Sequence, residues 1–139
     1  MSNLFYKFQL KKLEEDQRKR ADIRCWYINE LKGLHSIIVP FADQNETVSN
    51  YIFPVVLGRD VQLSRKVVRR QLAEAGIQTS VHYPAVHRFS MFKELQSNVP
   101  NTEYASDNLI SLPMFANLQK SQVVQVVSKL WEILDISHG

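Results

Sequence analysis

The sequence predicts an α+β fold, in which a mostly antiparallel sheet of three to four strands has helices packed on one face and follows a long N-terminal helix. Residues 2–31 contain neither Gly nor Pro, and β-branched runs alternate with helical patterns after them. No internal repeat is present. Because 139 residues with 45% hydrophobic side chains can supply one core, we expect a single domain over 1–139, with the helix at 1–32 and the α+β core at 33–139.

The first element is expected to be one helix of about 28 residues, roughly 40 Å long. Apolar residues recur at helical spacing near both of its ends, but the segment from Glu14 to Arg20 has none. The middle of the helix therefore faces water or a polar partner. A helix longer than its own core can cover is typical of an element that bridges two domains or packs against a second subunit. Gly33 is expected to end it.

Two strands are expected to follow this helix. The runs Ser36 to Phe41 and Tyr51 to Leu57 are rich in β-branched and aromatic residues. A polar stretch, Ala42 to Asn50, separates them and predicts a long loop. The two strands are therefore expected to pair in an antiparallel manner.

A second helix and a third strand are expected next. Asp60 is predicted to cap the helix, because a short side-chain oxygen can accept from its first N–H groups, and Gly76 is predicted to end it. Ile77 to Val81 then predict the third strand. The buried stripe of the helix is expected to consist of Val61, Val67, Val68 and Leu72.

Beyond Pro84 the pattern breaks into shorter pieces. We expect a helical turn near Phe89 to Leu95, a helix from Asn101 or Thr102, and a short extended piece at Ile110 to Leu112. Ser121 is expected to cap a final amphipathic helix. Its apolar side is predicted to be Val123, Val124, Val127, Leu130, Trp131 and Leu134.

Composition and charge argue against several functions. The densest basic stretch, Lys11 to Arg24, is interrupted by acidic residues, which predicts a solvated helix face rather than a nucleic-acid surface. No apolar run approaches the ~20 residues that span a bilayer, so no membrane partner is expected. Cys25 cannot form an intrachain disulfide and is expected to be a buried or half-buried thiol. With no signal-peptide pattern, a lone thiol predicts the cytoplasm.

Four short motifs follow one another in the C-terminal half. They are Gly76 to His87 (GIQTSVHYPAVH), Met91-Phe92, Pro100 to Ser106 and Leu112 to Met114. Together they resemble the C-terminal region of the DegT/DnrJ family of nucleotide-sugar aminotransferases. The opening of the chain also resembles the long helix that leads from the family's large domain into its small one. The resemblance covers nearly the whole chain and implies an aminotransferase small-domain fold and a place in polysaccharide biosynthesis.

The resemblance also implies pyridoxal phosphate, which the family holds in its large domain through a lysine Schiff base. The segments that hold it lie upstream of the region matched here. A Schiff-base lysine must be desolvated beside a phosphate cradle, whereas the lysines of this chain lie in polar, helix-surface contexts. We therefore expect no catalytic residue, and no cofactor unless a separate large domain is supplied. The chain is expected to be a stand-alone or truncated small domain without activity alone.

His82, Tyr83 and His87 are the candidate substrate-binding residues. The resemblance implies that their loop closes over the active site, with its His and Tyr positions facing the sugar nucleotide. Strand alternation would put His82 and Tyr83 on opposite faces, so at most one points into a given cleft unless Pro84 turns the chain. Because a ligand site needs concavity and the large domain would supply the other wall, we favour the interpretation in which Tyr83 packs on the core and His82 satisfies a backbone group. A metal site is not expected, because two histidines and a distant Cys25 lack a recognisable ligand spacing.

Two other functions remain open. An interaction module is one, because a domain cut from a larger enzyme exposes apolar surface that finds a partner. A homo-oligomer, such as a dimer, would then form through Leu4, Phe5, Phe8 and Trp26. The other is one half of a split aminotransferase, which would transfer an amine to a nucleotide-linked keto sugar once a cofactor domain binds.

Overall fold

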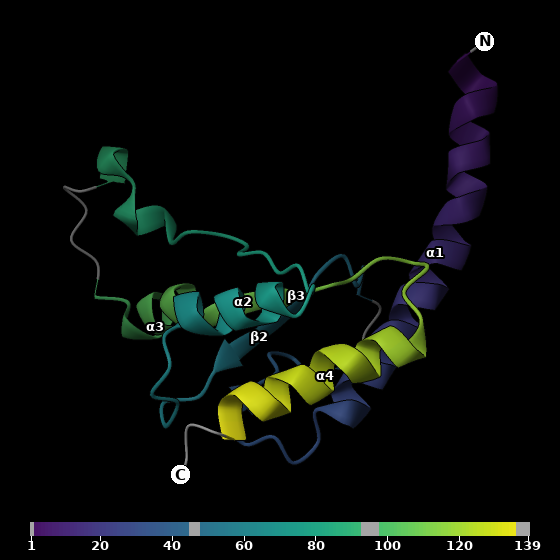
Figure 1. The fold of residues 1–139 in the computed structure, drawn as a ribbon. Coiled ribbons are helices and arrows are strands. Elements are labelled where there is room, and N and C mark those ends of the chain that lie inside the picture. The colour runs from purple at the N-terminus through teal and green to yellow at the C-terminus, as the bar shows by residue number, and fades with distance from the viewer. Residues whose placement is uncertain (1, 45–47, 93–97, 136–139) are drawn as a thin grey trace.

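The computed structural model of the protein describes residues 2–44, 48–92 and 98–135, with side chains at residue 10 and from residue 12 onward. The α+β class is confirmed by three strands and four α-helices in this part of the chain. In order, the elements are α1 (Ser2–Glu30), β1 (Ile37–Ile38), β2 (Phe53–Leu57), α2 (Arg65–Glu74), the 3₁₀ turns η1 (Val86–Arg88) and η2 (Ser90–Phe92), α3 (Pro100–Asn108), β3 (Leu109–Leu112) and α4 (Lys120–Asp135) (Figure 1).

The three strands form one antiparallel sheet in the order β1-β2-β3. The predicted pairing of the first two strands is confirmed, although β1 keeps only two residues. The third strand was predicted at Ile77 to Val81, and this is wrong: that segment makes a single bridge, from Ser80 to Ser111. The strand that pairs with β2 is β3, and its side chains at Ile110 and Leu112 are buried in the core.

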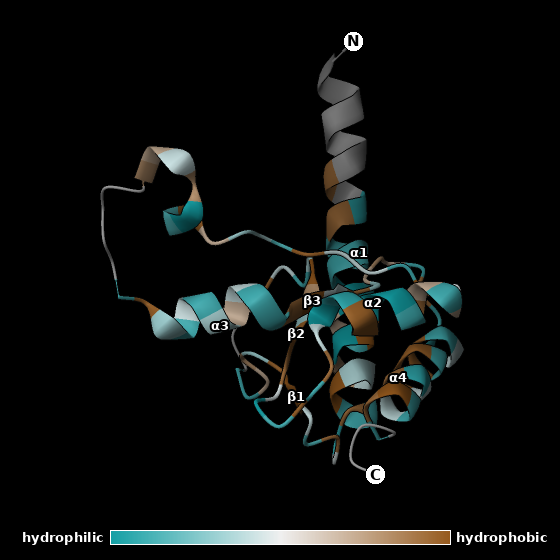
Figure 2. Ribbon diagram, turned by 60° about the vertical axis from the view of Figure 1, so that its left-hand side comes forward, coloured by the Kyte–Doolittle hydropathy of each residue, from teal (hydrophilic) through white to brown (hydrophobic). Residues whose placement is uncertain are grey.

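One face of the sheet carries the core. Phe53, Val55 and Leu57 alternate along β2 and join a buried cluster that includes residues of α1, α2 and α4. Figure 2 shows these apolar strands beside the helices. On α4 the buried stripe is slightly rotated from the prediction, since Val124 is exposed and Trp131 is partly buried. The buried positions of α4 are Val123, Val126, Val127, Leu130, Ile133 and Leu134.

The helix ends follow local chemistry, with two corrections. Ser64, not Asp60, caps α2, and its hydroxyl accepts from the N–H of Val67 at 3.4 Å. The helix α4 begins one residue before the predicted cap Ser121, at Lys120. The predicted stops are confirmed, because Gly33 and Gly76 have φ values of 88° and 76°, a region that favours glycine.

The helix α1 is longer than the core it covers, as predicted. Ile23, Tyr27 and Leu31 recur every four residues and are buried, whereas Leu10 and Leu13 are exposed. The N-terminal half of α1 extends beyond the other elements (Figure 1). Cys25 lies between the buried positions and is exposed, so the prediction of a buried or half-buried thiol is wrong. Among the described helices, none has the length and apolar character needed to cross a membrane.

Tyr27 joins three parts of the fold. Its ring stacks on Phe53 with centroids 4.6 Å apart, and its hydroxyl donates to the carbonyl of Pro113 at 2.9 Å. Burial raises the pKa of the Tyr27 phenol far above its usual value. The helix, the central strand and the segment that follows β3 therefore meet at one side chain.

Replacing Tyr27 with Phe keeps the ring but leaves the Pro113 carbonyl without this donor. We expect the free energy of unfolding to fall by about 1–2 kcal/mol at neutral pH, the usual effect of one buried hydrogen bond. The raised pKa adds a pH dependence: the unfolded phenol ionises near pH ~10, so the stability from the neutral phenol is complete below that pH and is lost as pH rises. Urea unfolding at neutral and alkaline pH measures both effects.

The control is Tyr51→Phe, since Tyr51 is 60% exposed. The Tyr27→Phe difference from the unsubstituted chain should shrink at alkaline pH, while the control should match the chain throughout. Equal stability of Tyr27→Phe and the unsubstituted chain at neutral pH would contradict this account of Tyr27.

Candidate functional site

The three predicted site residues lie on one irregular segment, residues 81–92, which we call the 81–92 loop. It leaves the sheet at the single bridge between Ser80 and Ser111 and contains only the short turns η1 and η2. Strand alternation therefore does not decide which way its side chains point. Its geometry depends on contacts with β3 and α3, which are distant in sequence.

His82 is held at the edge of the sheet by two hydroxyl groups. Its Nδ1 lies 3.0 Å from Oγ of Ser111 and 3.3 Å from Oγ of Ser80. The rings of Tyr83 and Tyr51 meet its imidazole edge-on, with centroids 5.1 and 6.5 Å away. The imidazole is thus oriented by hydroxyl and ring contacts, whereas the contact with a backbone group stays a prediction.

Tyr83 and His87 are placed differently from His82. The Tyr83 side chain is 70% exposed, so the expectation that it packs on the core is wrong. The Nε2 atom of His87 lies 3.4 Å from a carboxylate oxygen of Glu103 on α3. Of the three residues, only His82 lines the groove described next.

A groove of about 540 Å³ lies beside His82, between the edge of the sheet and α4. Its polar lining includes Gln122 and Gln125 from α4, and its apolar lining includes Met114 and Phe115. Within the described part of the chain, no Asp, Glu, Lys or Arg lines this His82 groove. A lining of amide, hydroxyl and imidazole groups together with apolar side chains suits an uncharged polar molecule better than a phosphate.

The sequence did not single out Ser111 or the two glutamines. Ser111 carried a weak signal, as the only polar residue of the strand LISL, and it is almost fully buried. Gln122 and Gln125 are three positions apart on α4, so they project from one side of that helix. Their meeting with His82 depends on chain segments that are far apart in sequence.

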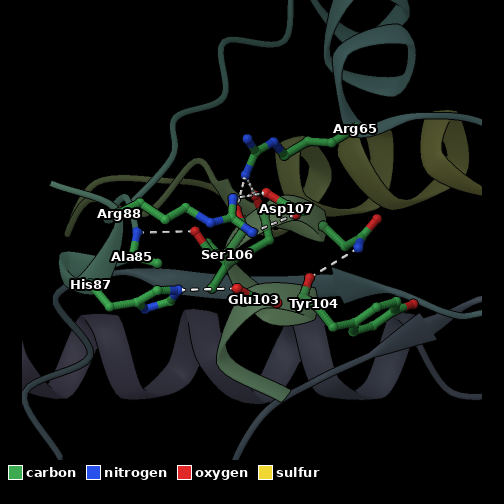
Figure 3. Close-up of polar contacts among 10 residues, drawn as sticks. Arg65, Ala85, His87, Arg88, Glu103, Tyr104, Ser106 and Asp107 are labelled. Carbon is green, nitrogen blue, oxygen red and sulfur yellow. Dashed lines mark hydrogen bonds and ion pairs between the residues drawn. The ribbon is translucent and has the colours of Figure 1, made fainter. Parts of the chain in front are cut away.

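Acidic residues of α3 contact the second half of the loop (Figure 3). The Arg88 guanidinium donates to both carboxylate oxygens of Asp107, with Nη2 at 2.9 Å from Oδ2. This pairing lowers the pKa of Asp107 and raises the pKa of Arg88. The Ala85 N–H donates to Oγ of Ser106 at 3.1 Å.

Solved structures share this fold. Helicobacter pylori PseC, an aminotransferase involved in the biosynthesis of pseudoaminic acid, superimposes with a TM-score of 0.83 over 92% of this chain and 35% of that one, at 22% identity. The aminotransferase TlmJ from Streptoalloteichus hindustanus gives 0.82 over 96% of this chain and 36% of that one, at 25% identity. The fold is therefore one that aminotransferases contain.

The chain belongs to the DegT/DnrJ/EryC1/StrS aminotransferase family, whose model matches residues 4–131. The UDP-4-amino-4,6-dideoxy-N-acetyl-beta-L-altrosamine transaminase of Campylobacter jejuni is 25% identical over 129 residues, which are 91% of this chain and 34% of that protein. An uncharacterized protein of Methanocaldococcus jannaschii is also 25% identical, over 91% of this chain and 34% of its own length. The chain thus spans about a third of the length of these relatives, and the predicted family resemblance is confirmed.

The described residues do not fit pyridoxal phosphate as a covalently held group. Lys19 and Lys129 pair with Glu15 and Glu132 at 2.7 and 2.8 Å, which leaves them beside carboxylates rather than a phosphate cradle. No lysine of the described part lines the His82 groove. The other lysines with described side chains are exposed: Lys12, Lys32, Lys66 and Lys120. Lys7, Lys11 and Lys93 lie outside the described side chains.

Replacing Ser111 with Ala removes the nearer hydroxyl from His82 and leaves the backbone bridge to Ser80 intact. We expect the His82 imidazole to be held less firmly, because a neutral hydrogen bond of about 1 kcal/mol is lost and, among the described residues, the farther Ser80 hydroxyl is the polar group left beside Nδ1. Its ring NMR resonances should move toward those of a freely rotating histidine. His35, which is exposed, serves as the internal reference.

Ser80→Ala is the matched comparison. The Ser80 hydroxyl is exposed and lies 3.3 Å from Nδ1 of His82, whereas that of Ser111 lies at 3.0 Å. It should shift the His82 resonances less than Ser111→Ala does. An equal or larger effect of Ser80→Ala would show that Ser111 does not orient the ring.

Proposed function

We propose that these 139 residues form the small domain of an aminotransferase that acts on a nucleotide-linked keto sugar, and that this domain transfers no amine alone. The observation that carries the proposal is the family match over residues 4–131 in a chain spanning about a third of its relatives' length. The sugar as substrate is supported by the named transaminase of Campylobacter jejuni and by the His82 groove, whose described lining has amide and hydroxyl groups but no Asp, Glu, Lys or Arg.

In this proposal residues 1–139 act as one domain and His82, Tyr83 and His87 face the substrate. One buried cluster that extends from Ile23 to Leu134 supports a single folding unit. His82 is held in place at the groove, and the exposed Tyr83 ring next to it is available to a ligand. His87 stands on the same loop, paired with Glu103. An exposed thiol at Cys25 agrees with the reducing cytoplasm.

The cofactor chemistry is assigned to a large domain that acts together with this one, whether it forms part of a split enzyme or of a longer chain. Pyridoxal phosphate supplies an electron sink for amine transfer when it is bound there. The 81–92 loop supports a covering partner of this kind, since Val86 and Met91 are 59% and 78% exposed. Apolar side chains gathered on a surface are typical of a contact site.

Incubation of the purified protein with pyridoxal phosphate followed by borohydride tests this proposal. We expect no single lysine to be modified in stoichiometric amount, because every lysine with a described side chain is exposed or ion-paired and none is desolvated beside an anion site. Peptide mass spectrometry and absorbance of the mixture measure the outcome. The Campylobacter jejuni transaminase, treated in the same way, is the positive control.

Scattered modification at low yield, equal in the native and the urea-unfolded protein, would support the proposal. Stoichiometric modification of one lysine in the native protein alone would refute it, since the chain would then hold the coenzyme by itself.

A self-associating module is the second candidate, and one observation favours it. Leu10 and Leu13 are 62% and 49% exposed on the part of α1 that extends beyond the other elements (Figure 1). They stand three positions apart, so they lie on one side of the helix. Trp26 contributes less than expected because it packs partly against the core. The other predicted contact residues, Leu4, Phe5 and Phe8, lie outside the described side chains.

If α1 mediates self-association, the double substitution of Leu10 and Leu13 by Glu should convert an oligomer to a monomer. The reason is that two carboxylates would have to be desolvated in the interface, at a cost of several kcal/mol. Light scattering measures the molecular mass. Gln17→Glu, at an exposed position of the same helix, controls for added charge. An oligomer unchanged by the double substitution would exclude this surface.

A further inference from the structure

Three residues of α3 make polar contacts with the 81–92 loop. Glu103, Ser106 and Asp107 stand at intervals of three and one along the helix, so their side chains share one side of it. They contact the imidazole of His87, the N–H of Ala85 and the guanidinium of Arg88, respectively (Figure 3). One face of α3 thus contacts three positions of the loop between residues 85 and 88.

The helix α3 is itself anchored to the body of the fold, which makes it a fixed support. The hydroxyl of Tyr104 donates to the carbonyl of Leu57 in β2 at 2.6 Å. The guanidinium of Arg65, in the first turn of α2, donates to the carbonyl of Ser106. A second guanidinium, that of Arg59, lies over the Tyr104 ring at 4.3 Å from its centroid. These contacts connect α3 to the sheet and to α2.

Apolar burial contributes little to holding the loop. The large side chains of Tyr83, Val86, Phe89 and Met91 are all exposed, and Val81 and Phe92 at the two ends of the loop are half-buried. Ala85 is the one buried hydrophobic residue among the loop positions described. A segment with so little buried apolar surface has little resistance to local opening. Its conformation is therefore decided by the contacts with α3 and, at its start, by the His82 contact with Ser111.

We propose that Glu103, Ser106 and Asp107 are positioning residues that hold the 81–92 loop in the conformation in which it meets the substrate. The loop is fixed at two places, by Ser111 at His82 and by α3 at residues 85–88. Tyr83 lies between these places, so both determine where its exposed ring stands. The substrate role of the loop rests on the proposed function, but its attachment to α3 does not.

Amide hydrogen exchange followed by NMR on the whole chain tests this inference. In Ser106→Ala, we expect the Ala85 amide to exchange about five- to tenfold faster, the factor expected for one lost hydrogen bond. In Asp107→Ala the increase should be smaller, because this residue holds the loop through an exposed ion pair with Arg88. The amides of Val55 and Ile110, inside the β2–β3 pairing, should keep their rates. The ring resonances of Tyr83 should shift in the same variants although neither substitution touches that ring.

Conservative variants separate positioning from a general structural role. Ser106→Thr and Asp107→Glu retain the hydroxyl and the carboxylate, so they should restore most of the slow Ala85 exchange. Asn101→Ala, at an exposed position in the first turn of the same helix, should leave both readouts unchanged. Added salt should reproduce part of the Asp107→Ala effect, because the Arg88–Asp107 pair is exposed and is screened.

Two results would overturn the inference. One is an Ala85 amide whose rate is the same in Ser106→Ala, Asp107→Ala and the unsubstituted chain. The other is a parallel rise at Ala85, Val55 and Ile110, which would show that the substitutions destabilise the whole fold. Neither result involves the coenzyme, so failure here is distinguishable from failure of the proposed function, which the borohydride experiment decides.

Discussion

Tyr27 connects α1 to the central strand and to the segment after β3 through its contacts with Phe53 and Pro113. The ring fixes α1 across the central strand, and the hydroxyl ties the segment after β3 to the same helix. Met114 and Phe115 follow Pro113 directly and form part of the apolar lining of the His82 groove. Pro113 also lines this groove, so one side chain connects the long helix to the wall of the groove.

Charge is divided between two neighbouring surfaces. No Asp, Glu, Lys or Arg lines the His82 groove among the residues described, whereas α3 presents Glu103 and Asp107 to cationic or ionisable partners on the loop. Neutral amides and hydroxyls select by geometry, since each must find a partner when it is covered. Exposed ion pairs contribute little to overall stability. They nevertheless orient a segment that has almost no apolar burial to orient it, so a weak interaction has a local consequence.

The sequence predicted those features that depend on neighbours along the chain. Helical spacing and Gly33 were sufficient for α1, and a run of β-branched and aromatic residues was sufficient for β2. The prediction of a strand at Ile77 to Val81 failed because a strand requires a paired neighbour, and Ser111 offers that segment one bridge only. The site follows the same rule. His82 was singled out from its motif, but its partner Ser111 is 29 residues away, and no local pattern predicts that hydrogen bond.

Within the described part of the chain the core is buried, but two surfaces expose apolar side chains. One buried cluster joins residues from Ile23 to Leu134, so the core of the described part is formed by this chain's own side chains. Leu10 and Leu13 of α1 and the large apolar side chains of the 81–92 loop from Tyr83 to Met91 have no comparable cover within the described residues. The relatives are about three times as long, and the region that matches this chain covers 34% or 35% of their length. A hydrophobic core can be completed within one domain, whereas a substrate groove needs a second wall. A buried core with exposed apolar side chains beside the proposed site is therefore the arrangement expected of a domain that shares its substrate site with a second domain.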